Sequence, residues 1–133
     1  MILDNKAIAR SYLEDVWNAK RIERIDDLVT DTFTDHHYPP DFPLGPKGAK
    51  RWFTLVTTAF PDINCGINDI IAEGDKVVAQ YILSGTHAGE FAGVPGSGKF
   101  ISVEAVSIYQ ISDGKISESW VISGLLAELL KTN

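Results

Sequence analysis

The chain contains little cysteine, a minority of basic side chains and no long apolar run. Its single cysteine, Cys65, cannot form an internal disulfide, and no cysteine and histidine cluster has the spacing of a zinc site. Acidic residues outnumber basic ones and give a net charge of -6, which argues against a nucleic-acid-binding protein. No segment approaches the ~20 apolar residues that a membrane helix requires, so we expect no membrane partner.

The N-terminal segment lacks the apolar core and small-residue cleavage site of a signal peptide, so we expect a cytoplasmic protein. Hydrophobic residues make up 44% and charged residues 23% of the chain, as in ordinary globular proteins. A length of 133 residues fits one domain, which we expect to span residues 1–133. The pattern around Cys65 predicts a small buried side chain and not a nucleophile. We expect no metal and no other cofactor.

The first half of the chain has the apolar periodicity of helices. Asp4 or Asn5 is a suitable N-terminal cap for the first one, and Pro61 ends the last. Three prolines between residues 32 and 44 predict an irregular connection there. The expected helices cover approximately residues 5–19, 22–29 and 46–60.

In the second half the periodicity changes to two, which is typical of strands. Turn residues Gly74 and Gly114 predict two hairpins. The glycine-rich loop of residues 88–98 joins two strands and is expected to form the rim of an opening. Residues 125–130 are apolar and predict a last short helix over part of the sheet. The expected strands are approximately Ile63–Glu73, Lys76–His87, Lys99–Ile111 and Lys115–Ile122. Helices followed by strands indicate an α+β fold, in which a cone-shaped, curved antiparallel sheet wraps around the N-terminal helices and encloses a pocket.

Histidines supply the first candidates for chemistry. His36 and His37 follow Asp35, a pattern compatible with a general base or a metal site. A metal is disfavoured because adjacent side chains on an extended chain point in opposite directions and no third ligand is suitably spaced. We expect at least one of the two to line the pocket, the alternative being one solvated and one packed histidine. His87 ends a strand, either at the pocket mouth or bonded to a turn.

Two glutamates lie within strand patterns. Glu104 interrupts an apolar run, so it is either an acid-base group on the inner face or, as we favour, a residue of the outer face. Alternation places Glu118 and Trp120 on one face with Ile116 and Ile122. Aromatic side chains that converge on a pocket can form walls for a flat ligand. The candidates are Trp17, Tyr38, Trp52, Tyr81, Phe91 and Trp120.

Short motifs recur in a characteristic order along nearly the whole chain. They are Tyr12 with residues 16–18, Asp35-His36, residues 45–48, Phe60-Pro61-Asp62, residues 72–75, 85–91, 93–95 and 113–116, and Glu118-Ser119-Trp120. In order and spacing they resemble the SnoaL-like polyketide cyclase family, a branch of the nuclear-transport-factor-like superfamily whose fold ketosteroid isomerase shares.

The resemblance implies a pocket for a small hydrophobic carbonyl compound. Cyclases of the family use an aspartate three or four residues after that tryptophan for an intramolecular aldol closure, whereas this chain has Ser123 and Gly124 there. Ordinary ester cyclase activity is therefore not expected. Either His36 or His87 transfers the proton in cyclase- or isomerase-type chemistry, with Glu104 or Glu118 as partner, or the chain is a non-catalytic small-molecule binding module. A homodimer through the outer sheet face is also expected.

Overall fold

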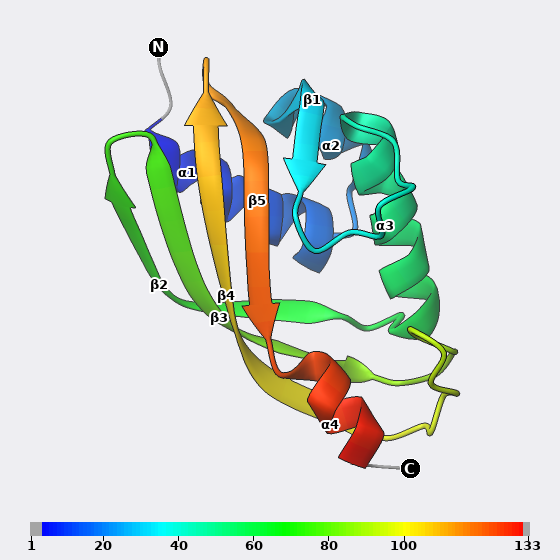
Figure 1. The fold of residues 1–133 in the computed structure, drawn as a ribbon. Coiled ribbons are helices and arrows are strands. Elements are labelled where there is room, and N and C mark those ends of the chain that lie inside the picture. Colours follow the sequence, from blue (N-terminus) through cyan, green and yellow to red (C-terminus); the bar gives the residue numbers. More distant parts are fainter. Residues whose placement is uncertain (1–3, 132–133) are drawn as a thin grey trace.

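The computed structural model describes residues 4–131, an α+β fold that confirms the expected class (Figure 1). Within these residues one five-stranded sheet has the order β1-β5-β4-β3-β2. None of the helices in this range is long and apolar enough to cross a membrane. The strands are β1 (Val29–Asp35), β2 (Asn64–Glu73), β3 (Lys76–Thr86), β4 (Phe100–Ser112) and β5 (Lys115–Ser123); the α-helices are α1 (Asn5–Ser11), α2 (Ile25–Leu28), α3 (Pro46–Ala59) and α4 (Leu125–Lys131).

The N-terminal helix is continuous but changes its winding. The carboxylate of Asp4 caps α1 by accepting a hydrogen bond from the backbone N–H of Ala7 at 2.8 Å. After Ser11 the chain continues as a π-helical segment, Tyr12–Asn18, which buries Tyr12, Leu13 and Val16. A 3₁₀ turn, Ile22–Arg24, leads into α2, so the expected second helix is shorter and divided.

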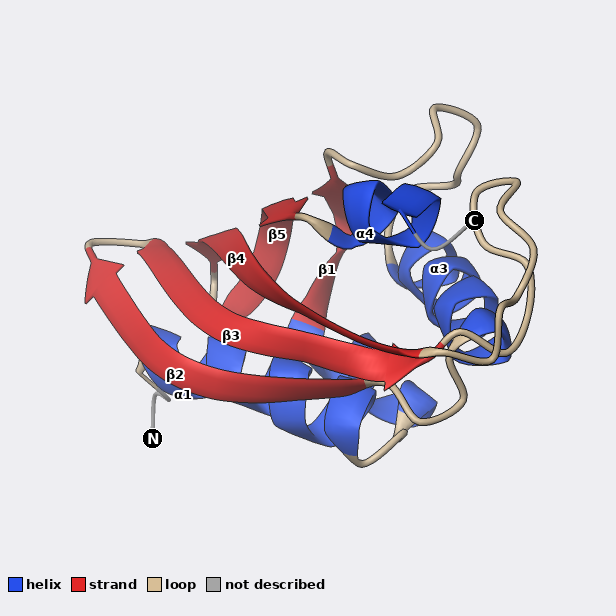
Figure 2. Ribbon diagram, turned by 90° about the horizontal axis from the view of Figure 1, so that it is seen from below, coloured by secondary structure: helices blue, strands red, loops and turns tan. Residues whose placement is uncertain are grey.

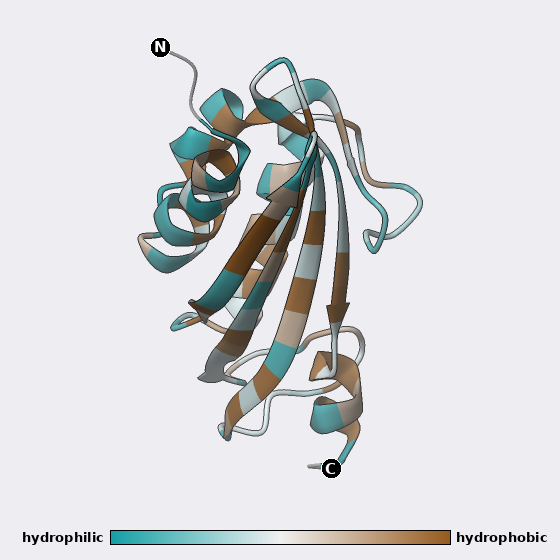
Figure 3. Ribbon diagram, turned by 90° about the vertical axis from the view of Figure 1, so that its left-hand side faces the viewer, coloured by the Kyte–Doolittle hydropathy of each residue, from teal (hydrophilic) through white to brown (hydrophobic). Residues whose placement is uncertain are grey.

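The strands bend along their length and the helices lie against one face of the sheet (Figures 2 and 3). The inner face of β3 and β4 buries alternate residues, as the period of two predicts. Residues on this face include Val77, Ala79, Tyr81, Ala105 and Tyr109. The hairpin between β4 and β5 has positive φ at both Asp113 (52°) and Gly114 (78°), which suits a tight two-residue turn.

Strands β2 to β5 pair antiparallel, as expected for the second half of the chain. Strand β1 makes the sheet mixed and replaces the beginning of the irregular segment expected from Thr32. Strand β1 pairs with β5 in parallel, with Thr34 opposite Glu118 and Asp35 opposite Ser119. Its burial is irregular, since Val29, Phe33 and Asp35 are buried but Asp31 is exposed. This short and polar sequence becomes a strand because the edge of β5 supplies hydrogen-bonding partners.

A bulge in β5 also changes which residues share a face. Ile111 lies opposite Ile116 but Gln110 lies opposite Glu118, so Ser117 is the extra residue. Alternation from Ile116 is therefore broken, and Ile116 and Ser119 are both buried inside. The expected common face of Ile116, Glu118 and Trp120 does not exist.

Candidate functional site

A pocket of about 320 Å³ lies between the inner sheet face, the helices and the loop before β4. Its walls are mainly apolar, and α4 contributes Leu125 and Leu126. Five of the six expected aromatic side chains line it: Trp17, Tyr38, Trp52, Tyr81 and Phe91. The volume lies at the lower end of the range for small-molecule sites, about 300–1,000 Å³.

Three of these rings form a continuous aromatic wall. Tyr38 stacks on Trp52 with ring centroids 5.2 Å apart and planes at 30°. Trp52 meets Phe91 edge to face at 5.9 Å and 69°. Such a wall presents flat apolar surface to a ligand and contributes little hydrogen bonding, so the polar groups elsewhere in the pocket must set the ligand's orientation.

The polar side of the pocket contains a carboxylate-histidine pair. Asp35 is 7% exposed, and one carboxylate oxygen accepts hydrogen bonds from the backbone N–H of His37 at 3.0 Å and from its ring Nδ1. The other oxygen accepts from the hydroxyl of Ser119. Because Nδ1 donates to the carboxylate, the neutral imidazole keeps Nε2 free as a proton acceptor. The pair therefore has the arrangement of a general base held by an orienting carboxylate.

Buried hydroxyl groups complete the polar part of the lining. The Tyr81 hydroxyl lies 2.8 Å from Oγ of Ser107, and Tyr12 and Tyr109 are also buried in the pocket wall. Burial raises the pKa of Tyr12, Tyr81 and Tyr109, and the negative charge of Asp35 raises that of Tyr12 further. These phenols therefore stay protonated and are available as neutral hydrogen-bond donors.

Cys65 also lines the pocket, and burial raises the pKa of its thiol to about 12. The thiolate, the reactive form, is then scarce at neutral pH. We expect iodoacetamide at pH 8 to label the native protein about 100-fold or more slowly than the urea-unfolded chain, with mass spectrometry as the readout. Equal labelling rates would contradict the burial of this thiol.

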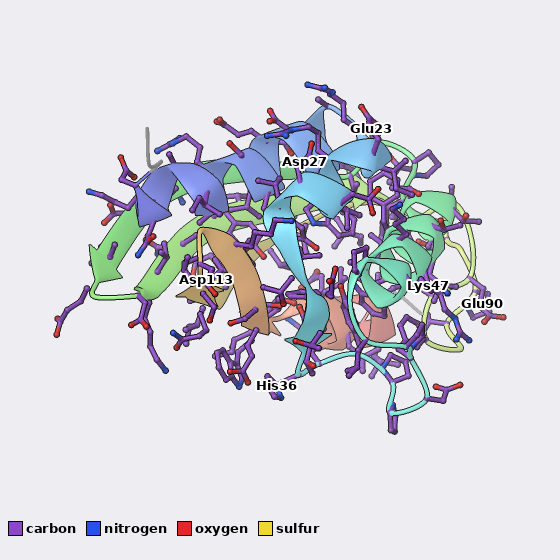
Figure 4. All side chains as sticks on the ribbon, turned by 90° about the horizontal axis from the view of Figure 1, so that it is seen from above. Glu23, Asp27, His36, Lys47, Glu90 and Asp113 are labelled. Carbon is purple, nitrogen blue, oxygen red and sulfur yellow. The ribbon has the colours of Figure 1, made fainter. Side chains whose placement is uncertain are left out.

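The structure places three expected site residues outside the pocket. His36 stacks on Trp120 with ring centroids 4.7 Å apart, and its Nε2 lies 2.9 Å from the Glu118 carboxylate. Figure 4 shows His36 at the periphery, pointing away from the interior. The reason is the pairing of β1 with β5, which directs Asp35 inward, together with the bulge at Ser117, which turns Glu118 and Trp120 outward.

The two remaining candidates are also away from the pocket lining. Glu104 is exposed on the outer face opposite Ile82, the alternative favoured from the sequence. His87 is completely buried and its ring stacks on Phe60 at 5.1 Å and 19°. Within residues 4–131, no group of three histidine, cysteine or acidic side chains is arranged to hold a metal ion.

Sequence reasoning did not single out Asp35 as a site residue, nor Tyr12, Ser107, Tyr109 and Ser119. For Asp35 and His37 a local signal was present, because an aspartate side chain commonly accepts a hydrogen bond from the backbone N–H two residues later in a turn, as Asp35 does from His37 directly after β1. For the hydroxyl residues no local signal exists, since serine and tyrosine at alternating strand positions are equally common in solid cores.

Comparison with known proteins identifies the relatives of this arrangement. The family model for the SnoaL-like polyketide cyclases matches residues 7–130. Curated proteins gave no match. Among solved structures, a protein from Jannaschia sp. CCS1, provisionally identified as a SnoaL-like polyketide cyclase, is 26% identical, with 92% of this chain and 87% of that chain covered and a TM-score of 0.82.

Two further structures are similar. TsrD from Streptomyces laurentii is 25% identical over 96% of this chain and 97% of its own, with a TM-score of 0.84. A protein from Bacillus cereus ATCC 10987, provisionally identified as a polyketide cyclase, is 31% identical over 92% of this chain and 77% of its own, with a TM-score of 0.74. Since the family model covers almost the entire chain, this protein belongs to the SnoaL-like polyketide cyclase family.

Proposed function

We propose that this protein is a general acid-base catalyst acting on a small hydrophobic carbonyl compound, with His37 as the proton-transfer group. The observation that carries the proposal is the pairing of the buried Asp35 carboxylate with His37, whose side chain is 33% exposed and lines an otherwise largely apolar, aromatic pocket. A base used for carbon acid chemistry works best where its protonation is stabilised by a fixed partner.

In the proposed reaction, Nε2 of His37 removes a proton from the carbon next to the carbonyl. The electron pair of that C–H bond becomes the enolate double bond, and the negative charge moves to the carbonyl oxygen. The neutral hydroxyls of Tyr81 and Ser107 are suited to hydrogen-bond that oxygen, and the Asp35 carboxylate stabilises the imidazolium. The enolate can take the proton back on the same carbon, which only exchanges it, or on the opposite face of that carbon or at a conjugated carbon further along, which is isomerisation. Alternatively the enolate carbon attacks a second carbonyl, whose oxygen takes the proton from His37, which is aldol closure.

A specific observation also supports the alternative of a non-catalytic binding module. Ser123 lines the pocket, at one of the positions where the resemblance to the cyclases leads us to expect the acidic residue. A hydroxyl there does not titrate near neutral pH. If His37 only anchors a ligand, the pocket binds carbonyl compounds without converting them.

The test uses a bicyclic ketone, 2-tetralone, in deuterated buffer. We expect wild-type protein to accelerate exchange of the protons next to the carbonyl, followed by NMR, in proportion to protein concentration. Binding is measured in parallel by quenching of tryptophan fluorescence, because Trp17 and Trp52 line the pocket. Binding without accelerated exchange would favour the binding module over the catalyst, and absence of both would contradict the pocket proposal.

We further propose that the protein forms a homodimer through the outer face of its sheet. Ile71, Val78, Ile108 and Trp120 are successive cross-strand partners on β2, β3, β4 and β5, so their side chains form one apolar row. Ile71 is 60% and Val78 37% exposed, and on the next row Ile122 is 64% exposed. A continuous apolar row on a sheet face is a typical surface for association with a second copy.

Sedimentation equilibrium is expected to give twice the 14.6 kDa chain mass. Ile122→Lys places a charge directly beside the apolar row on the outer face and should shift the population to monomer, while Glu23→Lys, on the helical side of the molecule (Figure 4), should not. A monomer at all concentrations, or equal effects of the two substitutions, would refute this interface.

A further inference from the structure

His87 is unusual among the described residues because it is completely buried and neither ring nitrogen has a hydrogen-bonding partner. Its ring stacks on Phe60. A neutral imidazole carries one donor and one acceptor, and burying both unpaired is already unfavourable. Protonation would add a second unpaired donor and a full charge in the same apolar surroundings. The buried position is therefore compatible only with the neutral ring.

His87 also lies where the two ends of the loop of residues 88–98 are joined by hydrogen bonds, a place that we call the loop neck. The backbone N–H of His87 donates to the carbonyl of Lys99 at 2.9 Å, and that of Gly98 donates to the carbonyl of His87 at 2.8 Å. Directly after the neck, the N–H groups of Ala88 and Gly89 donate to the carbonyl of Ala59, at 2.9 and 3.1 Å. The loop is thus attached to the end of α3 by hydrogen bonds that surround His87.

A chain of aromatic contacts connects His87 to the pocket. Phe60, on which it stacks, meets Phe91 of the loop at 5.7 Å and 67°. Phe91 in turn contacts Trp52, and Phe91 and Ala92 both line the pocket. Any movement that takes His87 away from Phe60 therefore displaces the loop that forms one wall of the pocket.

Among residues 4–131, the charged groups near His87 are engaged elsewhere or exposed, so none compensates a proton on its ring. The Asp62 carboxylate, from the turn after α3, accepts hydrogen bonds from the backbone N–H and hydroxyl of Thr86 at 2.7 and 2.8 Å. Glu128 of α4 pairs with Lys131 at 3.7 Å. Glu90 of the loop and Lys99 before β4 are exposed, and Figure 4 shows Glu90 at the periphery.

We propose that His87 is a proton-sensitive latch that holds the loop of residues 88–98 closed over the pocket. At neutral pH the uncharged ring packs on Phe60 and the loop stays attached to α3. Below about pH 6, where an ordinary histidine is protonated, the charged ring reaches water only if the loop neck separates from α3. The pocket then opens on the side of Phe91, whether the pocket is catalytic or only binds.

The test is hydrogen exchange of the loop-neck amides, corrected for the intrinsic effect of pH. Between about pH 7.5 and pH 5.5 we expect protection of the Ala88, Gly89 and Gly98 amides to fall about tenfold or more, while amides in the middle of β3 and β4 keep theirs. His87→Leu keeps an apolar filler of similar size without a titrating group, and its loss should be about twofold or less. His36→Gln, which removes an exposed histidine, should behave like the wild type.

An equal fall in wild type and His87→Leu, or loss of protection in the strands together with the loop, would overturn the latch. Should His87→Leu fold poorly, the steepness of the wild-type pH dependence decides the matter. Opening that brings one histidine ring into water lets protection of the neck amides fall by about tenfold for each pH unit below about 6.5. Protection that stays constant with pH, or that falls by about a hundredfold per unit, would refute the proposal.

Discussion

The substitution His37→Gln is expected to lower the rate of α-proton exchange by about 10²–10⁴-fold, the usual contribution of a general base. Glutamine keeps a polar side chain of similar reach, so the pocket and its aromatic wall should persist. The imidazole is lost as proton acceptor, while the ligand continues to bind. The measurement is the exchange rate of 2-tetralone at saturating concentration, together with its dissociation constant from tryptophan fluorescence.

The adjacent histidine provides a matched control. His36→Gln removes the same functional group one residue away, but on the outer side of the sheet beside Trp120 and Glu118. Its exchange rate should stay within about twofold of the wild type, as expected for a surface change. Equal losses in both variants, or an unchanged rate in His37→Gln, would exclude His37 as the base.

Asp35→Asn tests the orienting carboxylate separately. The amide group that this substitution introduces can donate to Nδ1 of His37 and favour the tautomer that carries the proton on Nε2, which cannot act as a base. We expect a loss approaching that of His37→Gln, with binding retained. A rate near the wild-type value would show that the short contacts of Asp35 serve only the fold.

The substitution Gly48→Ala is expected to destabilise the protein by about 3 kcal/mol, at the upper end of overpacking costs. Gly48 lies in the first turn of α3, where propensity alone predicts that alanine stabilises the helix by up to about 1 kcal/mol. A Cβ at this position would lie 2.0 Å from the backbone carbonyl oxygen of Pro43. Backbone cannot rotate away as a side chain can, so either the helix or the proline loop must move.

Urea unfolding followed by circular dichroism measures this effect, with Gly124→Ala as the control. A Cβ on Gly124 meets nothing within 4 Å, so that variant should stay within about 0.5 kcal/mol of the wild type. The loop that Gly48 contacts also positions Tyr38 and Phe42 against Trp52, at 5.2 and 6.1 Å. Gly48→Ala should therefore weaken ligand binding too, and a stabilised variant would contradict the close contact.

Local patterns were enough to locate most of the elements. The four strands of the second half begin and end within one or two residues of their expected bounds, because period-two burial is a property of each segment by itself. The tight turn at Asp113 and Gly114 follows from residue types that accept positive φ. The family could also be recognised in this way, since its motifs are short and occur in a set order.

The identity of the site residues depended on contacts between distant parts of the chain. Asp35 and Ser119 are 84 positions apart, and only the parallel pairing of β1 with β5 brings their side chains together. The bulge at Ser117 then turns Glu118 and Trp120 outward, so Glu118 pairs with His36 outside the pocket while His37 lines it. Periodicity reports which residues share a face, but which face becomes the pocket is decided by strand pairing and by one extra residue in the ladder.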